Sequence, residues 1–200
     1  MAILMMFEAK GATEEQYHAT NDHLGIHGDE DAPDGLVSHI AGLTGDGVLV
    51  VDVWESQEKL DTFFRERLAA ALEAAGLDAG EPTILPVHAM FPQGAGTNAG
   101  TIVVIDVDGF TTDAYDAMAS TMDAHVSTGG HDHPSVQHVA AARDGGLLVV
   151  DVWGSPEEFG AFAETQIGPA AVGAGVDPAT IQPKLVPVIN RIRGKAAVAG

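Results

Sequence analysis

Short apolar runs recur along the chain and alternate with amphipathic stretches. "ILMMFEA" begins at Ile3 and "TIVVIDV" begins at Thr101, and each has the length and composition of a β-strand. "LVSHIAGL" and "VLVVDVWE" are two further strand-like runs, and the "TGDG" between them predicts a hairpin. The second half of the chain repeats this pattern, with "RDGG" at the turn.

Helices are expected after the first and the third strand of each half. "TEEQ" at residues 13–16 is a capping-box sequence that opens a helix. Ser56 and Ser155 are the expected N-caps of the second helix in each half. That helix in the first half has apolar residues at four-residue spacing, which predict one buried face: Leu60, Phe64, Leu68 and Leu72. The resulting order, β-α-β-β-α-β, is the ferredoxin-like pattern.

The two halves are copies of one unit. Trp54 and Trp153 lie 99 residues apart, and the same offset relates His39 to His138. The similarity extends over almost the whole chain, which indicates a duplication. We therefore predict a first repeat at 1–91, a linker at 92–99, a second repeat at 100–192 and a flexible tail at 193–200.

The hairpin strands predict how the repeats combine. "VLVVDVW" and "LLVVDVW" are apolar on both faces, whereas a sheet with helices on one side only should alternate. The other face must therefore be covered, and the second repeat is the obvious cover. The predicted fold class is α+β, with two ferredoxin-like repeats whose sheets pack into one barrel within a single chain. We expect a monomer with an internal pseudo-dimer, with a homodimer as the alternative.

Composition narrows the classes of partner. The formal net charge is −20, which repels nucleic-acid phosphates and anionic lipids, so neither nucleic acid nor membrane is expected as a partner. Cysteine is absent, which excludes disulfides and thiolate chemistry. The N-terminal apolar run has no basic leader, and no run reaches membrane-spanning length. A cytoplasmic location is expected.

The third strand and the helix after it resemble a known family. "VVDVWESQEKLDTFF" and "VVDVWGSPEEFGAFA" are similar to this region of antibiotic biosynthesis monooxygenase-like proteins, in the dimeric α+β barrel superfamily. The resemblance covers both halves and implies a tandem fusion of two units that other members supply as a homodimer. It also implies a range of activities, which includes cofactor-independent oxygenases of polycyclic phenols and haem-degrading enzymes.

The haem-degrading branch is disfavoured by the residues present. That branch has a haem-binding histidine on the helix after the tryptophan, and Phe64 and Ala163 stand at this place here. It also has an asparagine in its first strand, and neither "ILMMFEA" nor "TIVVIDV" contains one. No glycine-rich loop joins a strand to a helix in the manner of a dinucleotide site. We therefore expect no haem, flavin or nicotinamide cofactor.

Each hairpin pairs a histidine with an aspartate. Counting outward from the turn places His39 opposite Asp52, and His138 opposite Asp151. Directly opposed side chains have Cβ atoms roughly 4.5–5.5 Å apart, so an imidazole and a carboxylate can meet. The same count places Val37 opposite Trp54. A shift of one residue would remove the pairing.

These pairs are the candidate catalytic groups, His39 with Asp52 and His138 with Asp151. The carboxylate would hold one imidazole tautomer and leave the other ring nitrogen free to exchange a proton. Trp54 and Trp153 would form a flat wall for an aromatic ligand. A structural interpretation remains open, in which the pairs fix the strand register and the tryptophans fill the core.

Three further residues are candidates for substrate binding. Tyr17 and Tyr115 repeat near the start of each first helix, where they either direct a hydroxyl into the pocket or cover the sheet. His88 ends the last strand of the first repeat, whereas Ile189 stands there in the second. If the ancestral site used this histidine, only the first half retains it.

The remaining histidines are weak candidates for a metal site. His23 and His27 are one helical turn apart, as are His18 and Asp22, and "HDH" at 131–133 could add ligands from the second repeat. These groups do not repeat between the halves, and "HLGIH" has no glutamate between its histidines. We expect no metal.

Two classes of function follow. The first is a cofactor-independent monooxygenase, or a related proton-transfer enzyme, that acts on an aromatic or polyketide-like small molecule. The second is a non-catalytic barrel that binds a small molecule or serves in a stress response.

Overall fold

The computed structural model describes residues 1–78, 80–91, 98–122 and 135–195. By its internal contacts the chain divides into two units. The first unit comprises residues 1–86 and 186–200, and the second comprises residues 87–185.

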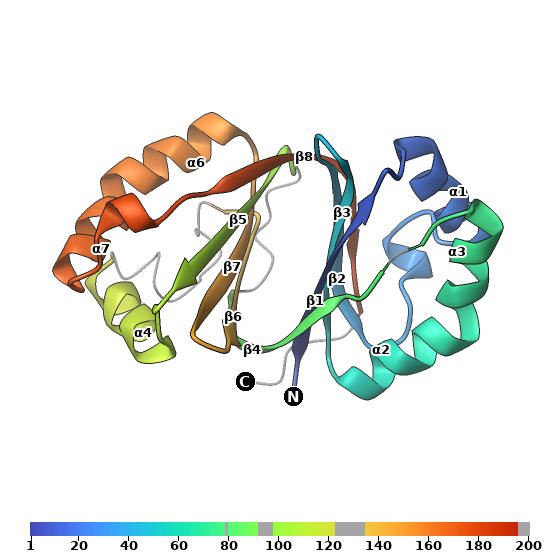
Figure 1. Ribbon diagram of the computed structural model, residues 1–200, viewed down its shortest axis with the longest axis horizontal. Coiled ribbons are helices and arrows are strands. Elements are labelled where there is room, and N and C mark those ends of the chain that lie inside the picture. The colour runs from blue at the N-terminus through green and yellow to red at the C-terminus, as the bar shows by residue number, and fades with distance from the viewer. Residues whose placement is uncertain (79, 92–97, 123–134, 196–200) are drawn as a thin grey trace. The chain divides into compact units, whose positions relative to one another are not determined.

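The first unit is an antiparallel sheet with helices on one face (Figure 1). The central strand β3 (Gly47–Trp54) pairs with β1 (Ile3–Lys10) and β2 (Leu36–Leu43). The covering helices are α1 (Glu14–Leu24), α2 (Gln57–Phe63) and α3 (Ala69–Ala75), with a π-helical turn at Phe64–Leu68 and a 3-10 turn at Asp29–Asp31. The start of β4 (Thr83–Phe91) pairs with β1, and the end of β8 (Lys184–Arg193) pairs with β2.

The second unit repeats this plan. Its central strand β7 (Gly146–Trp153) pairs with β5 (Thr101–Asp108) and β6 (Gln137–Arg143). Its helices are α4 (Thr112–Thr121), α6 (Pro156–Phe162) and α7 (Gly168–Gly173), with a π-helical turn at Ala163–Ile167 and a 3-10 turn at Pro178–Thr180. The end of β4 pairs with β6.

The predicted fold class is confirmed. The hydrogen-bonded strand order is β1-β3-β2-β8-β5-β7-β6-β4, which is a closed barrel. The units defined by contacts differ from the sequence repeats in their last strands. Residues 87–91 of β4 belong to the second unit, and residues 186–193 of β8 belong to the first. Each repeat therefore donates the end of its last strand to the other unit.

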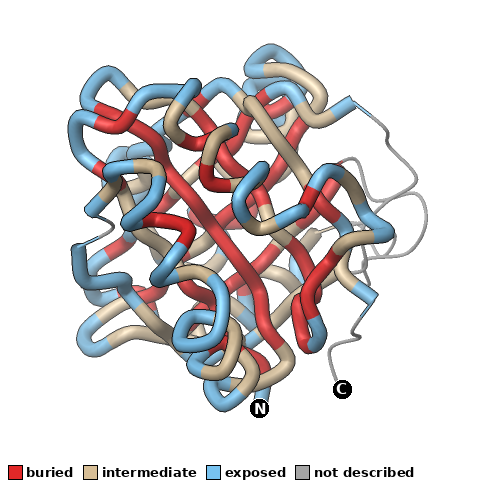
Figure 2. Tube along the Cα trace, turned by 90° about the vertical axis from the view of Figure 1, so that its right-hand side faces the viewer, coloured by how far each residue is buried: buried red, intermediate tan, exposed pale blue. Residues whose placement is uncertain are grey.

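Burial follows the strands, while the helix surfaces and turns are exposed (Figure 2). All eight residues of β3 are buried, which confirms that this strand is apolar on both faces. On the helix-facing side of β3, Val50 and Trp54 pack with Tyr17 and Leu60. Val51 and Val53, on the opposite face, are also fully buried.

The predicted helix starts are present, but one predicted core residue is not buried. Thr13 and Gln16 form both hydrogen bonds of the capping box, and the Ser56 hydroxyl accepts from the third residue of its helix. Phe64 is 47% exposed, so its assignment to the buried face was wrong. Phe63, three residues after Leu60, packs on Trp54 instead, with ring centroids 5.2 Å apart.

The hairpin registers agree with the prediction at both histidines. His39 is the strand partner of Asp52, and His138 is the strand partner of Asp151. One neighbouring expectation was wrong, because Leu36, and not Val37, pairs with Trp54. A β-bulge between Leu36 and Ser38 inserts the extra residue.

The segments expected to be a linker and a tail lie partly outside the described residues. Residues 92–97 of the linker and 196–200 of the tail are not described. Arg193 is the last residue of β8, and the N–H of Gly194 donates to the carbonyl of Val37 at 2.9 Å. Within the described part of the chain, no helix has the length and apolar character needed to cross a membrane.

Candidate functional site

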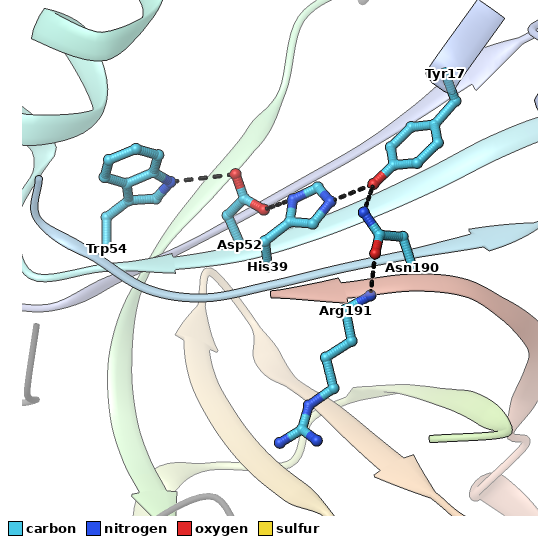
Figure 3. A network of polar contacts seen from close by, with 6 residues as sticks. All are labelled: Tyr17, His39, Asp52, Trp54, Asn190 and Arg191. Carbon is cyan, nitrogen blue, oxygen red and sulfur yellow. Dashed lines mark hydrogen bonds and ion pairs between the residues drawn. The ribbon is translucent and has the colours of Figure 1, made fainter. Parts of the chain in front are cut away.

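The first-unit site is built on the β2–β3 hairpin. Nδ1 of His39 lies 2.7 Å from Oδ1 of Asp52, and both side chains are largely buried. The indole N–H of Trp54 donates to the other carboxylate oxygen, Oδ2, at 3.3 Å (Figure 3). Each carboxylate oxygen of Asp52 therefore has a partner, as a buried charge requires.

Helix α1 adds Tyr17 to this pair. The Tyr17 hydroxyl oxygen lies 2.7 Å from Nε2 of His39, and the two rings are nearly parallel at 8°. The second imidazole nitrogen is therefore not free, contrary to the expectation from the sequence. Tyr17 is therefore the outermost member of an Asp52–His39–Tyr17 chain of close polar contacts.

Strand β8 contributes a residue that the sequence did not indicate. The side-chain amide of Asn190 donates to the Tyr17 hydroxyl oxygen at 2.8 Å (Figure 3). Asn190 corresponds to Ala89 of the first repeat, since each pairs with the equivalent alanine, Ala41 or Ala140. The sequence did hold one signal for Asn190, since the equivalent position of the first repeat is an alanine. Its contact with Tyr17 could not be predicted, because that contact depends on the exchange of strand ends between the repeats.

The polar partners of His39 set its charge. Burial lowers its pKa, but the Tyr17 and Asp52 oxygens that face its two nitrogens raise the pKa, and the result is about 10. The Tyr17 oxygen and the Asp52 carboxylate therefore favour the protonated form of the imidazole.

The second-unit site repeats the three-residue chain. The Tyr115 hydroxyl lies 2.6 Å from Nε2 of His138, and Nδ1 of His138 lies 2.6 Å from Asp151. Its surroundings differ from those in the first unit. Phe91, from the end of β4, stacks on His138 with ring centroids 4.8 Å apart. Among the described residues, nothing accepts a hydrogen bond from the buried indole N–H of Trp153.

His88 belongs to the second-unit site. Its Nε2 lies 2.8 Å from Oδ1 of Asp116 on α4, and its ring meets the Tyr115 ring edge-on at 5.6 Å. The expectation that it serves the first half was wrong, because residues 87–91 of β4 pair with β6. Burial, and then the negative charges of Asp151 and Asp116, raise the pKa of the Tyr115 hydroxyl.

Each site adjoins an apolar cavity within its own unit. The first-unit cavity has a volume of about 70 Å³ and reaches Tyr17, His39, Asp52 and Trp54. The second-unit cavity has a volume of about 80 Å³ and reaches Tyr115, His138 and Asp151, but Trp153 does not line it. An apolar cavity of about 150 Å³ accommodates a benzene ring. A ring-sized ligand therefore requires side chains around either cavity to move.

The other histidines do not converge on a metal site in the part of the chain that is described. His18 lies 3.6 Å from Glu14, and His27 lies 3.6 Å from Asp22, as exposed pairs. No group of three metal-ligating side chains occurs among the residues with a described position. His131 and His133 lie outside the described residues.

Several solved structures are similar to this chain over nearly its whole length. Two are provisionally described as monooxygenases. One, from Lactobacillus acidophilus, has a TM-score of 0.66 and 10% identity, over 96% of this chain and 95% of that one. The other, from Fusobacterium nucleatum, has a TM-score of 0.64 and 10% identity, over 98% of this chain and 95% of that one. An anthrone oxidase-like protein has a TM-score of 0.51 and 18% identity, over 100% and 95%.

No family model matches the chain, and no curated protein matches it. At these identities the structural likeness shows the fold. The chain has the α+β barrel fold of the monooxygenase-like proteins that its sequence resembles. Fold alone does not assign a reaction, which depends on the residues of the site.

Proposed function

We propose that the protein is a cofactor-independent enzyme of the monooxygenase type, or a related proton-transfer enzyme, acting on a small aromatic or polyketide-like molecule. The observation that carries the proposal is the buried Asp52–His39–Tyr17 chain, which ends at an apolar cavity beside Trp54. The same chain of residues recurs in the second unit. Perturbed titratable groups that converge on a cavity are typical of functional sites.

The first step is the removal of a proton from the substrate. A substrate hydroxyl beside Tyr17 would pass its proton to the coupled Tyr17–His39 pair. Asp52 then stabilises the imidazolium through the 2.7 Å contact with Nδ1. The apolar wall and Trp54 hold the aromatic ring and exclude water.

The second step consumes O₂ and requires no external reductant. The deprotonated substrate is electron-rich at a ring carbon that carries one hydrogen, and this carbon transfers electrons to O₂. A C–O bond forms, and the proton held by the Tyr17–His39 pair returns to the terminal oxygen to give a hydroperoxide. Loss of water then breaks the O–O bond, removes the hydrogen from the ring carbon and leaves a carbonyl. The net change converts the substrate O–H, one ring C–H and O₂ into two C=O groups and H₂O.

The pKa of His39 is matched to a phenolic substrate. At about 10 it equals the pKa of a simple phenol, about 10, so proton transfer between them is nearly balanced in free energy. A pKa of about 10 also means that only a small fraction of His39 is in its basic, unprotonated form at neutral pH. The rate should therefore rise with pH, by about tenfold for each unit below the pKa of His39.

A second candidate is a non-catalytic small-molecule-binding barrel, and the size of the cavity favours it. At about 70 Å³, the first-unit cavity does not hold a polycyclic ligand without rearrangement. In this case the His–Asp–Tyr chains would serve binding and strand register only.

We also propose that a single chain supplies both repeats, 1–91 and 100–192, and acts as a monomer in the cytoplasm without a nucleic-acid partner. The exchange of β4 and β8 ends supports this, because each unit takes part of its sheet from the other repeat. Sedimentation at low protein concentration should give the mass of one chain, and an obligate dimer would contradict the proposal.

The test of the enzymatic function is O₂ uptake by purified protein with a one-ring phenol and with a three-ring anthrone. Consumption of O₂ together with a carbonyl product is expected for at least one of them, and Tyr17→Phe should lose it. His23→Gln is the matched control, since His23 is exposed on the same helix, α1. Tight binding of the aromatic compound without O₂ uptake would support the binding barrel instead.

A further inference from the structure

Asn190 has a fixed orientation toward Tyr17. Its side-chain carbonyl, Oδ1, accepts the backbone N–H of Arg191 at 2.8 Å. A backbone N–H can only donate, so the Asn190 nitrogen, Nδ2, must be the atom that faces the Tyr17 oxygen at 2.8 Å. The amide is therefore a dedicated donor to Tyr17.

This donor limits what the Tyr17 hydroxyl can do with its own proton. A phenol oxygen accepts two hydrogen bonds and donates one. Asn190 occupies one acceptor position, and when the imidazole of His39 is protonated its Nε2 donates to the other. The hydroxyl proton of Tyr17 is then left to point into the cavity that this residue lines. His18, whose ring lies 5.4 Å from that of Tyr17, is the other titratable group beside it.

A ligand oxygen in the first-unit cavity would thus meet a strengthened donor. The cation at His39 and the amide of Asn190 both polarise the Tyr17 hydroxyl, and hydrogen bonds in such a chain reinforce one another. A negatively charged oxygen gains most from this arrangement, because hydrogen bonds to charged groups are the stronger kind.

The second-unit site lacks this arrangement. Ala89 occupies the place of Asn190, and it has no donor to offer Tyr115. Asp116, held at Tyr115's side by His88, adds negative charge there. Burial, and then the charges of Asp151 and Asp116, raise the pKa of Tyr115, in keeping with the Asp116 carboxylate beside it.

We propose that Asn190 is a positioning residue that makes the first-unit site bind the oxygen of its aromatic ligand as an anion, a phenolate or enolate. The second-unit site binds the same class of ligand only in its neutral form. This inference rests on the proposed function for the class of ligand, but it requires no reaction with O₂. It assigns the two copies different tasks, with the first-unit site carrying the proton transfer.

The probe is para-nitrophenol, whose ionised form is yellow and whose neutral form is nearly colourless. Its bound ionised fraction is measured by absorbance at a fixed pH. In the wild type we expect bound, ionised nitrophenol, which Tyr17→Phe removes and Tyr115→Phe retains. Asn190→Ala should weaken binding of the ionised form by about tenfold to a hundredfold, which is the contribution of a hydrogen bond in a charged chain.

Two variants keep the test independent of folding. Asn190→Asp preserves the shape of the side chain but replaces the donor with a negative charge, and it should abolish binding of the ionised form. Ala89→Asn offers the amide to Tyr115 and should create ionised binding in the second unit, measured in a Tyr17→Phe background. Thermal unfolding of each variant shows that the fold is retained.

The inference is overturned if Asn190→Ala leaves the ionised fraction unchanged, if the ionised signal depends on Tyr115, or if no ionised probe binds. Oxygen uptake separates this result from the proposed function. Ionised binding without O₂ uptake by any aromatic substrate supports the inference and contradicts the oxygenase. Oxygen uptake that does not respond to Asn190→Ala or Asn190→Asp does the reverse.

Discussion

The two sites have the same three central residues but different surroundings. In the first unit, the Asp52 carboxylate accepts a hydrogen bond from the indole of Trp54, and the Tyr17 hydroxyl accepts one from the amide of Asn190. In the second unit, the Trp153 N–H has no acceptor among the described residues, and Ala89 replaces the amide. The two units thus share the Asp–His–Tyr chain, while the residues around it differ.

The positions of the shared and the differing residues show which parts of the two sites vary. The shared histidines and aspartates are fixed by the register of their hairpins, and the shared tyrosines come from α1 and its copy α4. Asn190 and Ala89, which differ, lie on the strand ends that the repeats exchange. Each repeat therefore modifies the site of the other unit, which allows one site to change while its copy keeps the ancestral groups.

The largest expected effect separates the two tyrosines. Tyr17→Phe removes the hydroxyl that exchanges the proton and should lower kcat/KM by about 10²–10⁴-fold, the usual contribution of general acid–base catalysis. Tyr115→Phe should lower it by a much smaller factor, because this hydroxyl is held neutral. Steady-state kinetics with the substrate found by O₂ uptake measure both. Equal losses would show that the two sites work alike.

The pH dependence of stability isolates His39. Its pKa is raised to about 10 in the folded protein, compared with about 6.5 in an unfolded chain. The pair therefore contributes its full stability below about pH 6.5 and loses it as pH rises through about 10. The difference in free energy of unfolding between wild type and His39→Gln should shrink over this window. A difference that is constant with pH contradicts the raised pKa.

Removal of the carboxylate tests the pairing in each unit. Asp52→Ala should lower the pKa of His39 and cost about 1–3 kcal/mol, since a buried imidazole N–H loses its acceptor. Asp151→Ala should lower the pKa of Tyr115, because a negative charge that raises it is gone. NMR titration of the histidines and ultraviolet titration of the tyrosines report these changes. If the His39 pKa does not move, the imidazole and carboxylate are not paired.

The smallest effect compares the tryptophans. Trp54→Phe and Trp153→Phe each remove a similar buried volume, but only Trp54 donates to its aspartate. Trp54→Phe should therefore cost about 0.5–1.5 kcal/mol more than Trp153→Phe, the net contribution of one hydrogen bond. Denaturant unfolding of the two variants gives the difference. Equal costs would mean that the Trp54 contact with Asp52 contributes nothing measurable.

Local patterns predicted most of the framework. Turn residues and helix caps are short-range features of the sequence. Counting outward from the hairpin turn placed His39 opposite Asp52 correctly, and the cap at Thr13 marked the start of α1. They failed where a local irregularity changed the count. The bulge beside Val37 shifts the strand partner of Trp54, and it has no sequence signal as clear as a turn glycine.

The sequence by itself determined the order of the elements and the two His–Asp pairs, because hairpin register depends on residues close together in the chain. Only the tertiary structure decided which residues complete each site. Asn190 reaches Tyr17 across 173 residues, and His88 serves the second unit, since strand ends are exchanged between repeats. Pairing between distant strands depends on the assembled sheet, and a local pattern of apolar residues fits several such partners equally well.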